Sequence, residues 1–231
     1  LEQVNADQRS ALLMLWQGGI DGEVLSELEE NLREDIIDML NPAQLADAVR
    51  DMESDDVVDL VEDLEGAQQD AVMDALDDAD RIAVEQALSY PDDSAGRLMQ
   101  RAVVMAPQHW NVGQAIDFLR KEEKLPEQFY HMILVDARLK PVGYVTLGKL
   151  LGSPRTMALL DITEDTFRTI PVDQDEEEVA YAFNQYHLIS APVVDANDRL
   201  VGQITIDDAM AVLDTEAEED ILRLAGVGEG S

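Results

Sequence analysis

Apolar residues recur at every twelfth position through the first 90 residues, and this repeat constrains the fold more than any other feature. Two series share the spacing, one running four residues ahead of the other: Val24, Ile36, Ala48, Leu60, Val72 and Val84, and Leu28, Leu40, Met52, Leu64, Leu76 and Leu88. Residues four apart lie on one helical face. Twelve residues make about 3.33 turns, so a continuous helix would rotate this face by about 120° per unit. The region is therefore predicted to be a superhelical, solenoid-like array of short helices.

Helix breakers lie between the units of this repeat. Asn-Pro at 41–42 is suited to starting a helix, with Pro at the first helical position. Ser-Asp-Asp at 54–56 supplies a cap followed by acids in the first turn, which the helix dipole favours. Gly66 breaks the next junction, and Tyr-Pro at 90–91 closes the last one. The repeat predicts architecture and no chemistry.

From residue 99 the sequence changes to runs of β-branched residues, and two segments match at an offset of 59. Segments 133–146 and 192–205 each read as a buried strand, a polar turn, a second strand and a helix start. An amphipathic helix is predicted ahead of each, at Val112–Lys121 and Glu177–Tyr186. An entering strand is expected near 103–104 or 169–170.

The negative charge of the chain limits the kinds of molecule that it is expected to bind. It carries 16 Lys and Arg against 50 Asp and Glu, a formal net charge of −34, yet 46% of its residues are apolar, which argues for a packed fold. Nucleic acid and anionic membranes are poor partners for such a chain, and cations are natural ones; a solvated acidic surface explains the same charge. The lack of Cys excludes disulfides and Cys nucleophiles. No run of 18 apolar residues occurs, so no membrane span is expected, and the two ends suggest an excised part of a longer protein.

Three segments carry a resemblance to a known family. The duplicated segments resemble a tandem pair of cystathionine-β-synthase (CBS) domains, and Val-Gly-Gln-Ile-Thr-Ile-Asp-Asp at 201–208 is similar to the closing signature of that domain. The junction Tyr-Pro-Asp-Asp-Ser-Ala-Gly-Arg-Leu-Met at 90–99 resembles that of the MgtE family of magnesium transporters. The tail Glu-Ala-Glu-Glu-Asp-Ile-Leu-Arg-Leu at 216–224 does so too, and the resemblance covers essentially the whole chain.

The resemblance implies an α+β protein with four parts. These are an all-α superhelical N domain at 1–98, CBS domains at 99–157 and 158–214, and at 215–231 the start of a connecting helix toward a membrane domain. It implies a regulatory role without catalysis, in which magnesium-dependent closure of the N and CBS domains gates a pore. It also implies a homodimer at the cytoplasmic face of the inner (plasma) membrane, joined to its own transmembrane domain, with no nucleic-acid partner.

The resemblance also implies where magnesium would bind. Carried over by position, acidic residues at domain faces would hold the ion: Asp56, Asp175, Glu177, Asp208, Glu219 and Asp220. Each acidic cluster also fits an ordinary solvated helix start. The sequence departs from the family pattern in two places. Asn184 and His187 are expected near the same face, where the family has more acids, and Ala211 replaces a plausible acid on the last helix. Mg²⁺ prefers oxygen ligands, so carboxylates from separate domains would form a site only when those domains approach.

An adenine nucleotide is the second candidate ligand. Thr205 and Asp208 fit the Thr-x-x-Asp pattern that holds a ribose in CBS domains, which implies binding of ATP or a related nucleotide. The first segment reads Thr146-Leu-Gly-Lys149, with a cation in place of the acid, so at most one complete ribose site is expected. A nucleotide-binding CBS module of another effector and a helical scaffold for a protein partner stay open as alternatives. No catalytic residue is predicted, since the His residues lack metal-ligand spacing and no nucleophile or phosphate-loop motif occurs.

Overall fold

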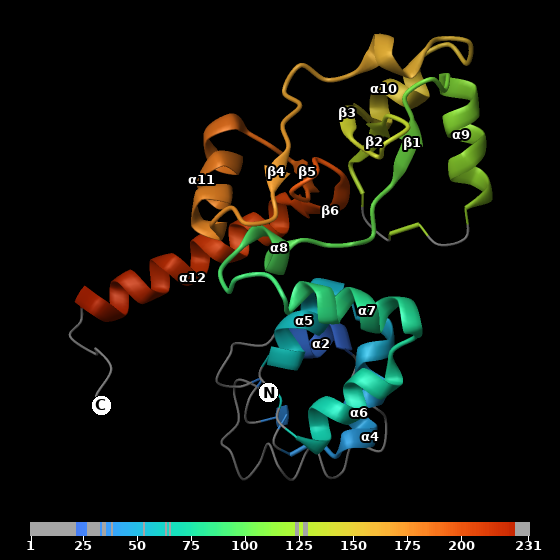
Figure 1. The fold of residues 1–231 in the computed structure, drawn as a ribbon. Coiled ribbons are helices and arrows are strands. Elements are labelled where there is room, and N and C mark those ends of the chain that lie inside the picture. Colours follow the sequence, from blue (N-terminus) through green and yellow to red (C-terminus); the bar gives the residue numbers. More distant parts are fainter. Residues whose placement is uncertain are drawn as a thin grey trace. The chain divides into compact units, whose positions relative to one another are not determined.

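The computed structural model describes residues 22–26, 33, 36–37, 39–52, 54–62, 64, 66–122, 125–126 and 129–224 (Figure 1). The chain divides into two compact units, Leu1–Ser89 and Tyr90–Ser231. The first unit is helical, and the second contains two three-stranded sheets with their helices. This is the α+β organisation that the sequence predicts.

Short helices build the first unit. Their bounds are α2 Gly22–Ser26, α4 Pro42–Ala48, the 3-10 helix η1 Val49–Asp51, α5 Ser54–Glu62, α6 Ala67–Ala75 and α7 Asp78–Ala87. Asn41 caps α4 in a capping box with Gln44, and Pro42 is the first residue of that helix. Gly66 precedes α6 with a φ of +57°, a conformation that glycine adopts at little cost. The predicted breaks at 41–42 and at Gly66 are confirmed.

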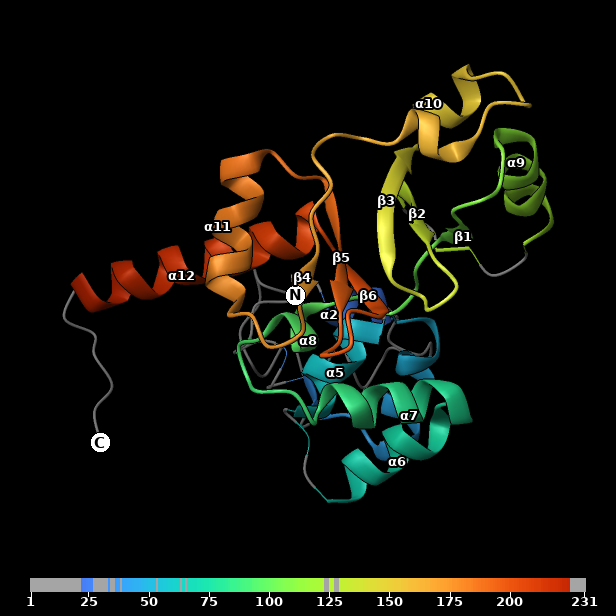
Figure 2. The same cartoon turned by 45° about the horizontal axis from the view of Figure 1, so that its top comes forward.

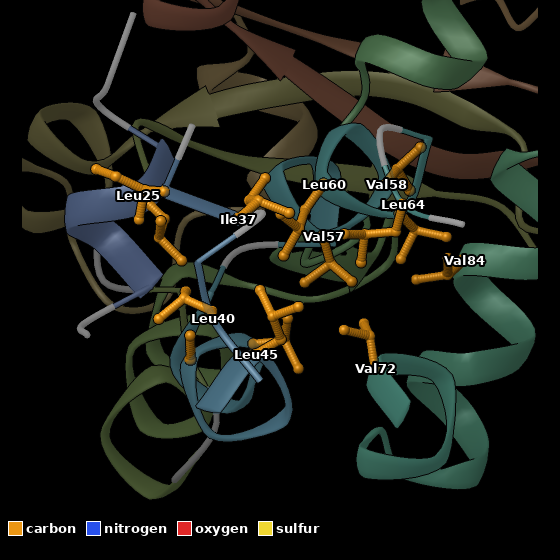
Figure 3. Packing of buried hydrophobic residues seen from close by; sticks show 14 of the residues in the cluster. Leu25, Ile37, Leu40, Leu45, Val57, Val58, Leu60, Leu64, Val72 and Val84 are labelled. Carbon is orange, nitrogen blue, oxygen red and sulfur yellow. The ribbon is translucent and has the colours of Figure 1, made fainter. Parts of the chain in front are cut away.

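The repeat positions form much of the core of the first unit (Figure 3). Five of them are at most 2% exposed: Ile36, Ala48, Leu60, Val72 and Val84. Val24, the first of this series, is 46% exposed, and its neighbour Leu25 is fully buried instead. The repeat fixes the spacing of apolar residues, but a short helix such as α2 can meet the core through either of two adjacent positions. Leu28 lies outside the described residues.

The second unit contains two modules of the same topology (Figures 1 and 2). The first consists of β1 Met105–Pro107, α9 Val112–Lys121, β2 His131–Val135, β3 Pro141–Thr146, α10 Leu147–Gly152 and the 3-10 helix η2 Leu159–Ile162. The second consists of β4 Ile170–Pro171, α11 Glu176–Tyr186, β5 Ser190–Val194, β6 Leu200–Thr205 and α12 Ile206–Leu224, with the short α8 Ala95–Leu98 beside it. In each sheet the first strand is parallel to the second, and the second is antiparallel to the third.

The predicted duplication is reproduced in backbone detail. The irregularity in the pairing of β2 with β3, at Leu134/Val135, has its counterpart at Val193/Val194, which is the equivalent place in the second copy. In each hairpin an aspartate closes the turn by accepting from two backbone N–H groups, through Oδ1 of Asp136 and Oδ1 of Asp195. The local signals in the sequence are therefore sufficient to place both hairpins.

The two modules contact each other through their sheets. Ile133, Val135 and Tyr144 of the first module form one apolar cluster with partly buried residues that include Leu200 of the second. The hairpin turns also touch, because the backbone N of Leu200 donates to the O of Leu139 at 2.9 Å. The two modules are thus packed together within the second unit.

Helix α12 is continuous from Ile206 to Leu224, so the predicted boundary at 214/215 falls inside one helix. Its first half packs against α11 through Ala209 and Val212, and its C-terminal part extends beyond α11 in both views (Figures 1 and 2). Within the described residues, no helix combines the length and apolarity that crossing a membrane requires. The other domain boundaries stay predictions.

Candidate functional site

Asp208, in the first turn of α12, has both carboxylate oxygens engaged. Its Oδ2 accepts hydrogen bonds from the backbone N (2.8 Å) and from Oγ1 (2.9 Å) of Thr205. Its Oδ1 accepts from Nε2 of Gln100 at 3.3 Å. Burial raises the pKa of Asp208, and the hydrogen bonds from Thr205 and Gln100 oppose that shift. The structure therefore brings the predicted pair Thr205 and Asp208 together where β6 meets α12.

Gln100 belongs to residues 99–102, which we term the strap. The backbone groups of Gln100 and Gln203 exchange two hydrogen bonds of 2.8 Å, so the strap runs beside β6. The Nε2 of Gln203 donates to a strap carbonyl at 3.1 Å. Gly202 makes this approach possible, because a Cβ there would lie 2.6 Å from a strap side chain and 2.7 Å from the O of Gln100. The strap thereby presents Gln100 to Asp208.

The first module holds Lys149 at the position of Asp208. The backbone N of Lys149 donates to Oγ1 of Thr146 at 3.2 Å, which caps α10. Its Nζ forms an ion pair with Oε1 of Glu164 at 3.1 Å and donates to the O of Thr163 at 3.4 Å. Glu164 is itself held by its backbone N, which donates to the O of Tyr144 at 3.0 Å. The cation that replaces the acid is thus paired within the chain.

Asp175 caps α11. Its Oδ1 accepts from the backbone N of Glu177 (3.0 Å) and of Glu178 (3.2 Å), which satisfies two N–H groups that the helix itself leaves unpaired. It also forms an isolated antiparallel bridge with Ser94. Both Asp175 and Glu177 are exposed. His187 ends the same helix in the left-handed conformation, so it lies at the opposite end from Asp175.

The remaining predicted ligands lie on two other helices. Asp56 is partly buried on α5 of the first unit. Glu219 and Asp220 lie on α12, and their side chains fall outside the described part of the chain. Ala211 is exposed on α12. Among the residues that the structure describes, no three His, Asp or Glu side chains gather closely enough to hold a metal ion, so the magnesium ligand set stays a prediction.

The structure brings into play two residues that sequence reasoning missed, Gln100 and Glu164, together with His131, to which the sequence assigned no metal-binding or catalytic role. His131 is 5% exposed, its Nδ1 is hydrogen-bonded to Oγ of Ser190, and its ring lies 4.1 Å from that of Tyr144. Burial lowers the pKa of His131 to about 4, with Glu164 acting in the opposite direction. The available signal was the duplication, because His131 and Ser190 are equivalent positions in it and begin the equivalent strands β2 and β5.

Comparison with known proteins gives consistent results over almost the whole chain. A family model described as the MgtE intracellular N domain matches residues 1–93, and the CBS domain model matches residues 95–154 and 160–215. A magnesium transporter MgtE of Bacillus subtilis (strain 168) is 32% identical over 212 residues, which are 90% of this chain and 46% of that protein. A magnesium transporter MgtE of Thermus thermophilus is 35% identical over 62% of this chain and 32% of its own length.

Solved structures agree with these relatives. The cytosolic domain of the Mg²⁺ channel MgtE in complex with ATP matches with a TM-score of 0.80 at 28% identity, over 91% of this chain and 86% of that one. The soluble part of a magnesium transporter matches with a TM-score of 0.79 at 25% identity, over 94% and 85%. The chain spans less than half of the length of the curated relatives named above.

Proposed function

We propose that this chain, which belongs to the MgtE family, is the magnesium-sensing regulatory region of a magnesium transporter. One observation carries the proposal: 90% of this chain matches a protein named a magnesium transporter. Over that length the chain consists of a helical N domain, a CBS pair and a long C-terminal helix, in that order. In the whole protein the chain would sit at the cytoplasmic face of the membrane and gate its own transmembrane domain. It would do so by binding, without catalysis.

The distribution of charge supports binding of a cation to the ends of the chain. Residues 1–98 contain 27 Asp and Glu against 5 Lys and Arg, and residues 158–231 contain 18 against 3. Residues 99–157, the predicted first CBS domain, contain only 5 against 8. All six proposed carboxylate ligands fall in the two acidic stretches: Asp56, Asp175, Glu177, Asp208, Glu219 and Asp220. The first CBS module would therefore contribute little to magnesium binding.

The physical basis of sensing is repulsion between acidic faces that magnesium reverses. Two like charges 4 Å apart repel by about 4 kcal/mol at an effective dielectric constant of about 20. A divalent ion between them turns that repulsion into attraction, so binding and closure of the parts favour each other by the same factor. Glu219 and Asp220, on the C-terminal part of α12, would transmit the state of the ion toward the pore.

Small-angle scattering tests this proposal on the chain as it stands. With millimolar Mg²⁺ the radius of gyration should be smaller than in EDTA at matched ionic strength, because matching removes simple screening. Replacing Glu219 and Asp220 by Ala should weaken magnesium-dependent protection of α12 from protease. The same replacement of Glu29 and Glu30 serves as the control and should leave that protection intact. An unchanged radius would contradict the sensor, and equal effects of the two double variants would contradict the ligand assignment.

Binding of an adenine nucleotide is the second proposed property. A relative of known structure was solved in complex with ATP, and Thr205 and Asp208 here stand at the end of β6 with hydrogen-bonding groups in place. An alternative function, a nucleotide-regulated CBS module of another effector, uses the same two residues. Calorimetric titration with ATP tests for binding, and the presence or absence of membrane-spanning segments in the native protein discriminates a transporter from another effector.

We further propose that the chain forms a homodimer through its CBS pair. Isologous two-fold dimers are the commonest oligomers. Exposed apolar side chains occur on both modules, including Leu151 on α10, Tyr181 on α11 and Ile189 beside β5. Sedimentation velocity should show a dimer at high protein concentration. A monomer at all concentrations, with and without Mg²⁺, would refute it.

A further inference from the structure

One hydrogen bond joins the two CBS modules at the point where their second strands begin. Nδ1 of His131, the first residue of β2, is hydrogen-bonded to Oγ of Ser190, the first residue of β5. The two positions are related by the same offset as the two hairpins. A contact between equivalent residues of two copies lies where the copies face each other symmetrically, as at the axis of an isologous dimer. Both residues are buried, so this bond lies in the interior of the interface.

The opposite end of the same interface is held by the hairpin turns. The backbone N of Leu200 donates to the O of Leu139. Nζ of Lys140 forms an ion pair with Oδ2 of Asp198 at 2.7 Å. Neither contact contains a histidine, the side chain whose ordinary pKa lies between about pH 5 and pH 8. A response of the interface to pH in this range is therefore expected at the end that His131 occupies.

On its own module His131 faces an aromatic ring and an acid that is already paired. Its ring lies 4.1 Å from that of Tyr144. Glu164 is the acid whose charge acts on His131, but Oε1 of Glu164 also forms the ion pair with Nζ of Lys149. The negative charge near the histidine is thus shared with a cation.

The second module presents a hydroxyl group to His131. This is the side chain of Ser190, and Thr205, which is the partner of Ser190 in the pairing of β5 with β6, is also uncharged. The carboxylate of Asp208 follows on α12, where its oxygens accept from Thr205 and from Gln100. The contact that crosses the interface therefore supplies His131 with a hydrogen bond and with no counter-charge.

A proton on His131 consequently works against the closed interface. A buried charge costs free energy unless a counter-charge pairs with it or water reaches it. Burial accordingly lowers the pKa of His131 to about 4, with Glu164 acting in the opposite direction, whereas a solvated histidine has a pKa of about 6.5. Separation of the modules at this end would admit water to the ring, so proton uptake and opening favour each other.

We infer that the contact between His131 and Ser190 is an acid-sensitive latch, which holds the two modules together while His131 is uncharged and opens when the ring takes up a proton. His131 is paired with Thr146 across β2 and β3, and Ser190 is paired with Thr205 across β5 and β6. The latch therefore lies at the end of the interface where α10 and α12 begin. Opening there would move the start of α12 relative to the first module. The latch itself does not depend on the proposed function, and only an effect on a pore would.

Thiol labelling of the intact chain measures the opening. The chain has no Cys, so Ile133→Cys, at an interface position 2% exposed, introduces a single thiol that reacts with 4,4′-dithiodipyridine when the interface opens. Each rate is divided by that of the same thiol in a His131→Gln background at the same pH, which cancels the pH dependence of the thiol. With pKa values of about 4 and 6.5, this ratio should rise about fourfold at pH 6 and about thirtyfold at pH 5, relative to pH 8. A ratio that stays constant would overturn the latch.

Ala180→Cys distinguishes opening of the interface from unfolding. Ala180 is fully buried in the core of the second module, so a thiol there reacts when that module unfolds. Ile133→Cys should react faster than Ala180→Cys, and its rate should depend less on urea, because opening exposes less surface than unfolding does. Equal rates with equal urea dependence would mean that both thiols report unfolding, and the latch would be refuted.

Ser190→Asp should reverse the sign of the response. It places a carboxylate opposite His131, so proton uptake by the ring favours the closed interface, and the normalised labelling of Ile133→Cys should fall between pH 8 and pH 6. A folded Ser190→Asp variant whose labelling still rises on acidification contradicts the inference. Circular dichroism checks the fold, and where this variant does not fold, NMR titration of the His131 ring in the parent chain decides. Ionisation of that ring above about pH 6 in the folded parent would equally refute the latch.

Discussion

The buried histidine between the two CBS modules gives a quantitative expectation for acid sensitivity. His131 stays neutral in the folded chain because burial lowers its pKa to about 4, while an unfolded chain has a histidine pKa of about 6.5. Between these values the unfolded state binds more protons, so stability is unaffected above pH 6.5 and falls as the pH is lowered toward 4. At pH 5 the two pKa values give a loss of about 2 kcal/mol relative to pH 8, and residual solvent screening reduces this to between about 1 and 2 kcal/mol.

Urea denaturation at pH 8 and pH 5 measures this loss. The chain has two Trp residues, so Trp16→Phe leaves Trp110, which packs against the core of the first module, as the only Trp whose fluorescence is followed. In that background His131→Gln should lose less stability than the parent on acidification, by about 1–2 kcal/mol. The exposed His109→Gln is the matched control and should behave as the parent does.

Carboxylates and the net charge also respond to acid, but they are common to all three proteins and cancel in the comparison. Glu164 is the acid whose charge acts on His131, and it is unchanged in both variants. If His131→Gln loses as much stability between pH 8 and pH 5 as the parent, His131 titrates normally in the folded state, and the argument from burial is wrong.

Three further predictions concern core packing, helix capping and the close contact between Gly202 and the strap, and the same denaturation assay measures all three. Phe183→Ala, at a fully buried site, should cost about 3–5 kcal/mol, whereas Gln185→Ala, at an exposed position of the same helix, should change stability by less than about 0.5 kcal/mol. Asp175→Ala should cost about 1 kcal/mol by removing the cap of α11, and Asp175→Ser should keep the cap; if Asp175 also binds Mg²⁺, both changes should weaken compaction equally. Gly202→Ala should cost about 1–3 kcal/mol because its Cβ would lie 2.6 Å from the strap, while Gly148→Ala, with no atom within 4 Å, should gain up to about 1 kcal/mol.

Local signals in the sequence are strong enough to predict most of the fold. The hairpins follow from an Asp that closes each turn and from apolar runs on both sides, so Asp136 and Asp195 occupy equivalent places. The helical repeat is predicted equally well, since an i, i+4 pair must face a core wherever it recurs. Val24 is the exception, because periodicity alone does not decide which of two adjacent apolar residues a short helix buries.

Gln100 pairs with Gln203 on β6, and Glu164 pairs in the same way with Tyr144 on β3. The equivalence of these two residues could not be found at the offset that relates the hairpins. Gln100 and Glu164 are separated by more than that offset, because the duplication is interrupted between them. Positions 122–130 separate α9 from β2, but only positions 187–189 separate α11 from β5. A scan at one fixed offset therefore aligns the hairpins and loses the segments that cross them. The magnesium ligands are harder to predict still, since they are proposed on separate parts of the chain. No local sequence pattern specifies that side chains from separate parts come together.

A structural role explains Asp175 better than it explains Asp208. Asp175 is exposed, so its charge is solvated and favoured by the helix dipole, and capping is a sufficient reason for it. Asp208 is the third residue of α12 and accepts a hydrogen bond from the backbone N of Thr205, as in a helix cap. It is nevertheless partly buried, and burial raises its pKa, which means that its charged form is disfavoured there. A neutral side chain would accept the same bond, as Gln44 in α4 and Gln114 in α9 do at the equivalent capping positions of this same chain. Capping alone therefore leaves the charge of Asp208 unexplained, and the proposed binding of a ligand at this carboxylate would explain it.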